Sequence, residues 1–318
     1  MFREQADPFA QHAVSGFLNS MSESRSSIQT NTLFPESGGA GHVQVALASS
    51  WLWLRKLMPL NYLLGLIGLF VAGIIAGSIN AVAGGGTLIS FPYLVGLGEP
   101  EIIANATNTA ALWPGSISSA IGYRRDTEVN RGLLIGLLIP SFIGGALGAL
   151  ILVITPPGLF KIIVPFLVLF ATLILAARNT LTRKIGERLT VAEHHATLAG
   201  RLWGFFFQLF IATYGGYFGA GMGILMLGSL SIMGMRDIHK MNALKTPLQA
   251  VVNMTAFVFF ALKGLVDWPT ALVLCIGAIT GGYGGARLAK RVNPKLLNTC
   301  VVALGLVVSA WLLYKAFQ

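Results

Sequence analysis

The sequence predicts an all-α, polytopic membrane protein built from two duplicated halves. Charged residues make up 11% of the 318 residues, against about 25% in soluble domains, and the apolar set AVILMFWYC makes up 54%. Long runs without any charge follow one another along the chain, and glycine clusters interrupt two of them. So few charges exclude a soluble enzyme. The runs do not alternate polar and apolar residues, which excludes an outer-membrane barrel as well.

The first element, residues 1–56, is polar and differs from everything after it. It contains the stretches SMSESRSSIQTNT and ESGGAGH, whose composition is typical of a disordered tail. No short basic start leads into an apolar core, so a secretory signal is not expected. A start codon assigned too far upstream is the alternative explanation for this tail.

From residue 57 onward, charged residues separate the predicted helices. A helix needs about 20 residues to span the hydrocarbon core of a bilayer. Six charge-free runs fit one helix each, namely 102–123, 132–160, 162–177, 246–262, 268–286 and 296–314. The other two runs, 57–98 and 202–235, are too long for one helix, so each is expected to hold a broken or re-entrant helix pair.

The breaks are expected at glycines, which lower helix propensity and permit positive φ. In the first run, the unbroken glycine triple at 84–86 predicts that one helix ends at Val82 and the next starts near Thr87. In the second run, Gly219 and Gly221 predict the same event. The alternative is that these glycines only allow helices to pack closely.

The two glycine clusters also mark an internal repeat, in which Gly84 and Gly86 match Gly219 and Gly221 at one common offset. Asn108 falls near Asn242 in the same comparison. Later glycines recur at a slightly larger offset and are expected to serve helix packing, namely Gly144, Gly145 and Gly148 in one half and Gly281, Gly282, Gly284 and Gly285 in the other. The chain thus divides into a first repeat at 57–180, a basic linker at 181–200 and a second repeat at 201–318. Each repeat is expected to hold a broken pair followed by three helices.

The basic residues in the loops favour inverted halves. If each broken pair returns to its own side of the membrane, fourteen of the Lys and Arg residues from Arg55 onward fall on one side and five on the other, with Lys245 left aside. If each pair instead crosses once, the halves are parallel and the division is twelve to seven. Because cytoplasmic loops are rich in Lys and Arg, the stronger bias favours inverted repeats with a cytoplasmic linker and both termini outside.

The residues that are absent from the predicted spans restrict the function. All twelve Asp and Glu lie in the tail or at predicted loops, so no carboxylate within a span is available for a cation site or a hydrolytic pair. The sequence shows no metal-ligand cluster and no Walker motif, and neither a metal nor a cofactor is expected. The net charge of +10 is carried by short loops, so nucleic acid is not an expected partner.

The remaining features point to a site for a small anion. Lys245 is the one charge within a predicted span, and it either holds a fixed positive charge for an anion or snorkels to the interface. The half-helix N-termini after the two breaks present free N–H groups and a partial positive charge. Amides and hydroxyls nearby either donate to an oxyanion or join neighbouring helices. The expected binding residues are Asn80, Gly84, Gly85, Gly86, Thr87, Asn105, Asn108, Gly219, Gly221, Asn242, Lys245, Gln249 and Asn253.

Two motifs resemble the signatures of a known family. The first combines AGSINAVAGGGTLISFP at 76–92 with ANATNT at 104–109, and the second combines GYFGAGMG at 216–223 with HKMNALK at 239–245. Both are similar to the sulfite exporter TauE/SafE family, and the resemblance covers about residues 60–316.

The resemblance implies a multi-pass permease of the cell inner membrane, whose members are associated with sulfite, sulfonates, thiosulfate and related anions. Together with the anion site, it predicts a secondary transporter that works by alternating access and is not an enzyme. An anion channel and a transporter of a non-sulfur organic anion are the alternatives. The expected partners are the anionic substrate and the lipid bilayer, and a homo-oligomer stays open.

Overall fold

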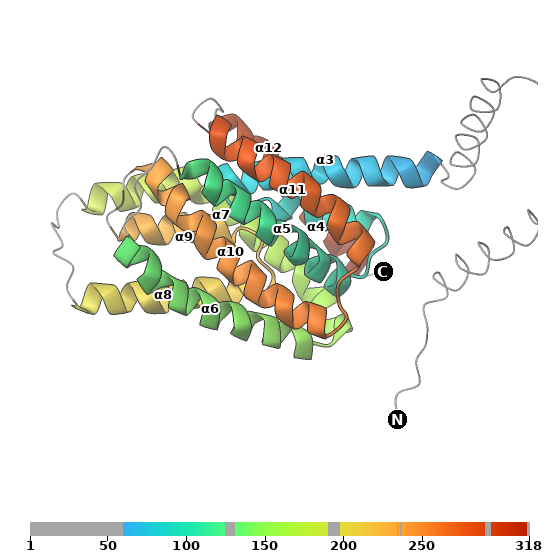
Figure 1. The fold of residues 1–318 in the computed structure, drawn as a ribbon, viewed down its shortest axis with the longest axis horizontal. Coiled ribbons are helices and arrows are strands. Elements are labelled where there is room, and N and C mark those ends of the chain that lie inside the picture. Colours follow the sequence, from blue (N-terminus) through green and yellow to red (C-terminus); the bar gives the residue numbers. More distant parts are fainter. Residues whose placement is uncertain are drawn as a thin grey trace, which may run out of the picture. The chain divides into compact units, whose positions relative to one another are not determined.

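The computed structural model describes residues 60–124, 131–189, 198–233, 235, 237–289 and 294–316 (Figure 1). The tail expected at 1–56 lies outside these residues. Throughout the described part, every regular element is a helix and no strand occurs. The helical membrane fold predicted from composition and charge is therefore confirmed.

The helices are numbered as in Figure 1, where α3 is the first one described. In the first half they are α3 (Leu60–Val82), α4 (Thr87–Gly96), α5 (Glu101–Tyr123), α6 (Arg131–Ile154) and α7 (Pro157–Leu189). In the second half they are α8 (Leu198–Tyr217), α9 (Met222–Ile232), α10 (Ile238–Leu262), α11 (Trp268–Leu288) and α12 (Pro294–Ala316). Each half therefore consists of a long helix, a short helix and three further long helices.

Both expected breaks occur inside the two long charge-free runs. The first separates α3 from α4 and begins after Val82, and the second separates α8 from α9 and begins after Tyr217. With 10 and 11 residues, α4 and α9 are shorter than the about 20 residues that a crossing needs. Within the described residues, six helices are long and apolar enough to span a membrane, and they lie in α3, α6, α7, α10, α11 and α12.

Two helix boundaries differ from the charge-free runs. The helix α7 continues to Leu189 and so includes the first part of the expected linker, because residues 178–189 contain no proline and a single glycine. The helix α10 begins before its run at 246, because the carboxylate of Asp237 caps it by accepting hydrogen bonds from the N–H groups of His239 (2.8 Å) and Lys240 (3.3 Å). The hydrogen bond from the His239 N–H is also the main reason why the pKa of Asp237 lies below its ordinary value.

The two halves interlock, because the long helix of each broken pair packs along a helix of the other half. The pairs are α3 with α11 and α8 with α6, while α5 and α10 pack against each other. A Cβ on Gly281 of α11 would lie 2.0 Å from the carbonyl oxygen of Ile74, and a Cβ on Gly144 of α6 would lie 2.6 Å from that of Leu209. Ile74 and Leu209 are matched by the same offset that pairs Gly84 with Gly219, so the two contacts correspond to one another.

The packing role expected for the later glycines is confirmed, with one exception. A Cβ would come within 3.0 Å of an atom of a neighbouring helix at Gly144, Gly145, Gly148, Gly281, Gly282 and Gly285. The expectation is wrong for Gly284, where a Cβ would meet no atom within 4 Å. This residue lies on α11 beside Gly285 but does not face the contact with α3.

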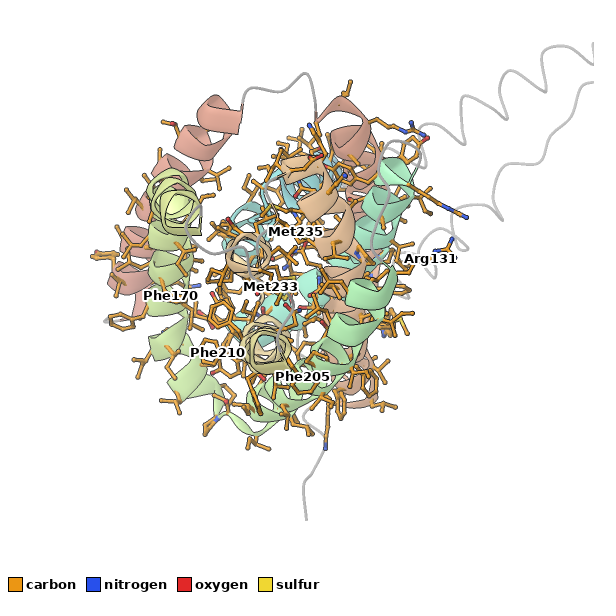
Figure 2. All side chains as sticks on the ribbon, turned by 90° about the vertical axis from the view of Figure 1, so that its left-hand side faces the viewer. Arg131, Phe170, Phe205, Phe210, Met233 and Met235 are labelled. Atoms are coloured by element: carbon orange, nitrogen blue, oxygen red, sulfur yellow. The ribbon has the colours of Figure 1, made fainter. Side chains whose placement is uncertain are left out.

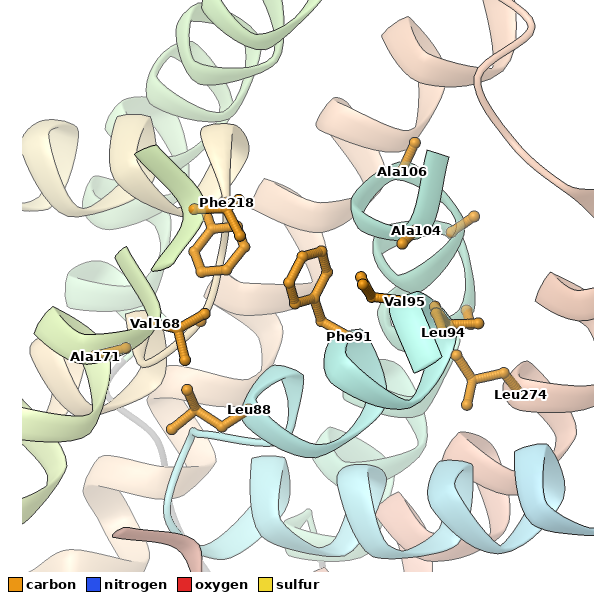
Figure 3. Close-up of a cluster of buried hydrophobic side chains, with 14 of the residues drawn as sticks. Leu88, Phe91, Leu94, Val95, Ala104, Ala106, Val168, Ala171, Phe218 and Leu274 are labelled. Atoms are coloured by element: carbon orange, nitrogen blue, oxygen red, sulfur yellow. The ribbon is translucent and has the colours of Figure 1, made fainter. Parts of the chain in front are cut away.

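Apolar side chains fill the interior and also cover the outside of the bundle. Phe91 of α4 and Phe218, which follows α8, meet edge to face in Figure 3 with ring centroids 5.2 Å apart. Phe170 and Phe210, labelled in Figure 2, are 46% and 67% exposed. Such exposure is unfavourable in water and acceptable in lipid, so these side chains indicate the surface that faces the hydrocarbon.

The glycine contact between α11 and α3 gives a test of the fold. We expect Gly281→Ala to lower the free energy of unfolding by about 1–3 kcal/mol, because its new methyl group would overlap backbone atoms of Ile74 that cannot move aside. The matched control is Gly284→Ala on the same helix, which should be neutral or stabilising by up to about 1 kcal/mol. Thermal unfolding in detergent, followed by tryptophan fluorescence, measures both. Equal melting temperatures of the two variants would contradict this packing.

Candidate functional site

The two helix breaks, one from each half, touch inside the bundle. Gly84 has a φ of 90°, which only glycine adopts easily, and it lies between α3 and α4. A Cβ on Gly84 would lie 2.6 Å from the Cα of Gly223 in α9, and a Cβ on Gly223 would lie 2.6 Å from the Cα of Gly84. Both glycines are buried. The backbones of the two breaks are therefore in direct contact, and no side chain larger than hydrogen fits between them.

The N-terminal ends of α4 and α9 converge at this contact. Asn80 holds the first one in place, because its Oδ1 atom accepts a hydrogen bond of 2.8 Å from the N–H of Gly86. The N–H groups of Thr87 and Gly223, at the first turns of the two helices, have no acceptor among the described residues. Each helix N-terminus carries about half a positive unit charge, so the two ends place a positive potential at one buried point.

Lys245 of α10 lies at the opposite end of the same break, where α3 stops. Its ammonium group donates hydrogen bonds to the carbonyl oxygens of Asn80 (2.9 Å) and Ala81 (3.3 Å). The side chain is fully buried, so the interpretation that it snorkels to the interface is wrong. The ammonium satisfies carbonyls that α3 leaves unpaired and compensates the negative end of that helix.

Two asparagines stabilise the ends of the broken helices reciprocally. Asn242 of α10 donates from Nδ2 to the carbonyl of Val82, the last residue of α3, over 3.3 Å. Asn105 of α5 donates from Nδ2 to the carbonyl of Tyr217, the last residue of α8, over 3.0 Å. The counterpart of Asn242 is therefore Asn105. The alignment of Asn242 with Asn108 is wrong, because α5 and α10 follow the larger offset of the later glycines and not the offset of the two breaks.

Asn108 has a different role, within its own half. Its Nδ2 atom donates to the hydroxyl of Thr87 over 3.3 Å, and its Oδ1 atom accepts a hydrogen bond from the hydroxyl of Ser90. The side chain thus joins α5 to the first turn of α4. Sequence reasoning did not select Ser90, although it lies three residues after Thr87 and so on the same face of a helix.

The polar stripe expected on α10 is buried along its whole length. Asn242, Lys245, Gln249 and Asn253 are between 0% and 6% exposed. The amide of Gln249 lies against the second break, since its Nε2 atom would be 2.8 Å from a Cβ on Gly223. Four buried oxygens in the described residues have no hydrogen-bond partner, namely Asn105 Oδ1, Asn242 Oδ1, Thr246 Oγ1 and Gln249 Oε1. Buried polar atoms without partners are costly, so these oxygens indicate a place that holds water or a ligand.

The glycines of the second break are needed for its backbone. Gly219 and Gly221 have φ values of 79° and 72°, and the hydroxyl of Tyr214 donates to the carbonyl of Ala220 between them over 2.7 Å. Gly85 differs from the other predicted site glycines. Its φ is not in the left-handed region, and a Cβ there would make only contacts of 3.6 Å or longer. The site therefore does not require a glycine at position 85.

The arrangement is suited to binding a small solute. Among the described residues, no group of three or more His, Cys, Asp or Glu side chains could hold a metal ion. The polar groups that do converge are amides, hydroxyls, backbone N–H groups and one ammonium. A groove between α5, α6 and α10 opens nearby on the bundle surface, and its lining includes Arg124, Arg131, Ala243 and Pro247.

Membrane-spanning helices, two broken helices that meet in the interior and a buried lysine define a polytopic membrane transporter. The sequence profile of the sulfite exporter TauE/SafE family matches residues 69–312, and the chain belongs to this family. The resemblance found in the motifs around the two breaks is thereby confirmed.

Three relatives have similar sequences over most of their length. A probable membrane transporter protein of Haemophilus influenzae is 30% identical over 247 residues, which cover 77% of this chain and 93% of the relative. The probable membrane transporter protein YfcA of Escherichia coli K12 is 30% identical over 249 residues, covering 78% and 89%. The probable membrane transporter protein YunE of Bacillus subtilis is 22% identical over 271 residues, covering 78% and 97%. No solved structure matches the chain.

The hydrogen bonds of Lys245 predict its effect on stability. We expect Lys245→Met to lower the free energy of unfolding by about 1–3 kcal/mol, because it removes the ammonium donor from the buried carbonyl of Asn80 and one of the two donors to that of Ala81. Lys263→Met is the matched control, since Lys263 is exposed at the other end of α10 and its loss should change little. Thermal unfolding in detergent compares them. A Lys245→Met protein as stable as the control would show that the ammonium does not stabilise the end of α3.

Proposed function

We propose that this protein is a secondary transporter of a small anion, namely sulfite, an organosulfonate or another sulfur oxyanion, in the cell inner membrane. The observation that carries the proposal is the convergence of two half-helix N-termini at the contact between Gly84 and Gly223. Backbone N–H groups at such ends are donors that suit oxyanions. The lysine ammonium lies at the end of α3, one break away, and adds a fixed positive charge.

The chemistry of the site supports an anionic substrate, and the family supports a substrate that contains sulfur. A sulfite or sulfonate group presents three oxygens that accept hydrogen bonds, and the break offers the N–H groups of Thr87 and Gly223 together with the amide of Gln249. No acidic side chain is buried in the described spans, so no fixed negative charge there would repel an anion. The family takes its name from sulfite export.

The packing of the halves supports alternating access. In Figure 1, α3 begins at the right of the view and α8 begins at the left, so the two equivalent helices run in opposite directions. In the repeat, α3 corresponds to α8 and α11 corresponds to α6, so the contact of α3 with α11 is equivalent to that of α8 with α6. Opposed repeats of this kind give a transporter two related conformations, open to opposite sides. We therefore propose inverted repeats whose shared centre is the glycine contact.

The groove between α5, α6 and α10 suits an access route. Arg124 and Arg131 attract anions to its opening. Its wall is formed by Ala243 and Pro247, on the side of α10 next to Thr246, whose hydroxyl oxygen is buried without a partner. An anion that enters there would pass α10 to reach the backbone N–H groups at the break.

Transport in liposomes tests the proposed function directly. The purified protein is reconstituted and offered sulfite, sulfate, thiosulfate, sulfoacetate and taurine, with malonate as the carboxylate analogue of sulfoacetate. A carrier for sulfur anions should show saturable uptake that is accelerated by the same anion inside the vesicle. Uptake without this acceleration would favour an anion channel, and preference for malonate would favour a non-sulfur organic anion.

A substitution at the glycine contact tests where the anion passes. We expect Gly84→Ala to lower the initial uptake rate by about tenfold or more, because its methyl group would overlap the backbone of Gly223 and push the two half-helix ends apart. Gly98→Ala is a closely matched control. Gly98 also has a positive φ, of 101°, so the backbone strain is similar, but a Cβ there meets no atom within 4 Å. If both variants transport equally, the contact between the breaks is not part of the pathway.

A further inference from the structure

The C-terminal ends of α3 and α8 expose equivalent carbonyls but have different hydrogen-bond donors. At the end of α3, Lys245 donates to the carbonyls of Asn80 and Ala81, and the hydroxyl of Tyr123 also donates to that of Ala81, over 3.3 Å. In the offset that relates the two breaks, the equivalent residues of α8 are Gly215 and Gly216.

At the end of α8, two buried carbonyls lack such donors. The N–H groups of Phe218 and Gly219 both donate to the carbonyl of Tyr214, which leaves the carbonyls of the next three residues outside the helical pattern. Asn105 donates to the last of these, that of Tyr217. Gly215 and Gly216 are buried, and no donor to their carbonyls is found in the described part of the chain.

Two sequence differences between the halves explain the missing donors. In the alignment of α5 with α10 that pairs Asn105 with Asn242, the position of Lys245 corresponds to Asn108. The side chain of Asn108 is shorter than that of a lysine, so it does not reach the carbonyls at the end of α8. Its amide is already bonded to Thr87 and Ser90. The same alignment pairs Tyr123 with Phe260, which is fully buried and carries no hydroxyl.

A third oxygen lies at the same end of α8. The Nδ2 atom of Asn105 is bonded to the carbonyl of Tyr217, so its amide lies beside this helix end, and its Oδ1 atom is buried without a partner. The Oδ1 atom of Asn242 is unpaired in the same way at the end of α3. Both helix ends therefore have an asparagine amide with an unpaired oxygen. Within the described part of the chain, only the end of α3 also has a cation, the ammonium of Lys245.

We propose that a sodium ion binds at the C-terminal end of α8, with the carbonyl oxygens of Gly215 and Gly216 and Oδ1 of Asn105 as ligands. It takes the place that the Lys245 ammonium holds at the end of α3. Neutral oxygens at the negative end of a half-helix suit a small monovalent cation, and no carboxylate is required. The inference rests on the proposed function, because it makes sodium the coupling ion of anion transport: the cation offsets the charge of the anion bound at the adjacent helix N-termini.

Binding of sodium can be measured without any sulfur anion. The purified protein is heated in detergent with NaCl, KCl or choline chloride at the same ionic strength. Sodium should raise the melting temperature saturably by about 2–4 °C over choline, because it binds the folded state alone. The proposal would be overturned if NaCl, KCl and choline chloride gave the same melting temperature.

Three variants test whether the sodium ion binds at the C-terminal end of α8. Asn108→Lys supplies the ammonium that the second end lacks and should abolish the sodium shift. Phe260→Tyr supplies the missing hydroxyl to Gly216 and should reduce the shift, which keeps the test valid if Asn108→Lys does not fold. Tyr123→Phe is the matched control, since it removes the hydroxyl from the α3 end, and should lower the melting temperature while keeping the shift. An unchanged shift in both Asn108→Lys and Phe260→Tyr would overturn the assignment of the site.

Transport then separates the two proposals. In liposomes, an inward sodium gradient should drive anion accumulation by the unmodified protein, whereas Phe260→Tyr, which lies outside the anion site, should reduce this dependence. If sodium stabilises the protein but no sulfur anion is transported, the proposed substrate is wrong and the cation site stands. If the anion is transported without any effect of sodium on melting or uptake, the cation site is wrong and the proposed function stands.

Discussion

The structure depends on the need to satisfy the backbone where two helices stop inside the membrane. A bilayer interior offers no water to a free carbonyl or N–H group, and each unsatisfied group costs several kcal/mol. Here the end of α3 receives donors from Lys245 and Asn242, and the end of α8 receives one from Asn105. In each case the donor belongs to the other half of the chain. The breaks can exist only because the halves complete one another.

The sequence predicted the breaks well because glycine is visible in a sequence. The triple at 84–86 and the charge-free length of the run led to helix ends at Val82 and Thr87, and both ends are found there. The burial of the α10 stripe was also predictable, because Asn242, Gln249 and Asn253 recur at helical spacing. These features depend on local chemistry, which the residue types record directly.

The partners of the site residues could not be predicted in the same way. Lys245 was expected to face either an anion or the interface, but its bonds to the carbonyls of Asn80 and Ala81 were not foreseen, because any residue type presents such carbonyls. The pairing of Asn105 with Asn242 was missed because the offset between the halves increases beyond the breaks. Every residue type has a backbone carbonyl, so the sequence does not show which carbonyl accepts a hydrogen bond. A shift of two or three residues between the repeats is enough to pair the wrong residues of two equivalent helices.

The interlocking of the halves has a consequence for biogenesis. The ribosome delivers α3 and α4 to the membrane long before α10 and α11, which supply the donors and the packing surface for the end of α3. During translation, the nascent first half must therefore hold an unfinished helix terminus in the translocon or in a lipid-water boundary until the second half emerges. Both helix termini receive donors from the opposite half, so neither terminus is complete before the second half has been inserted.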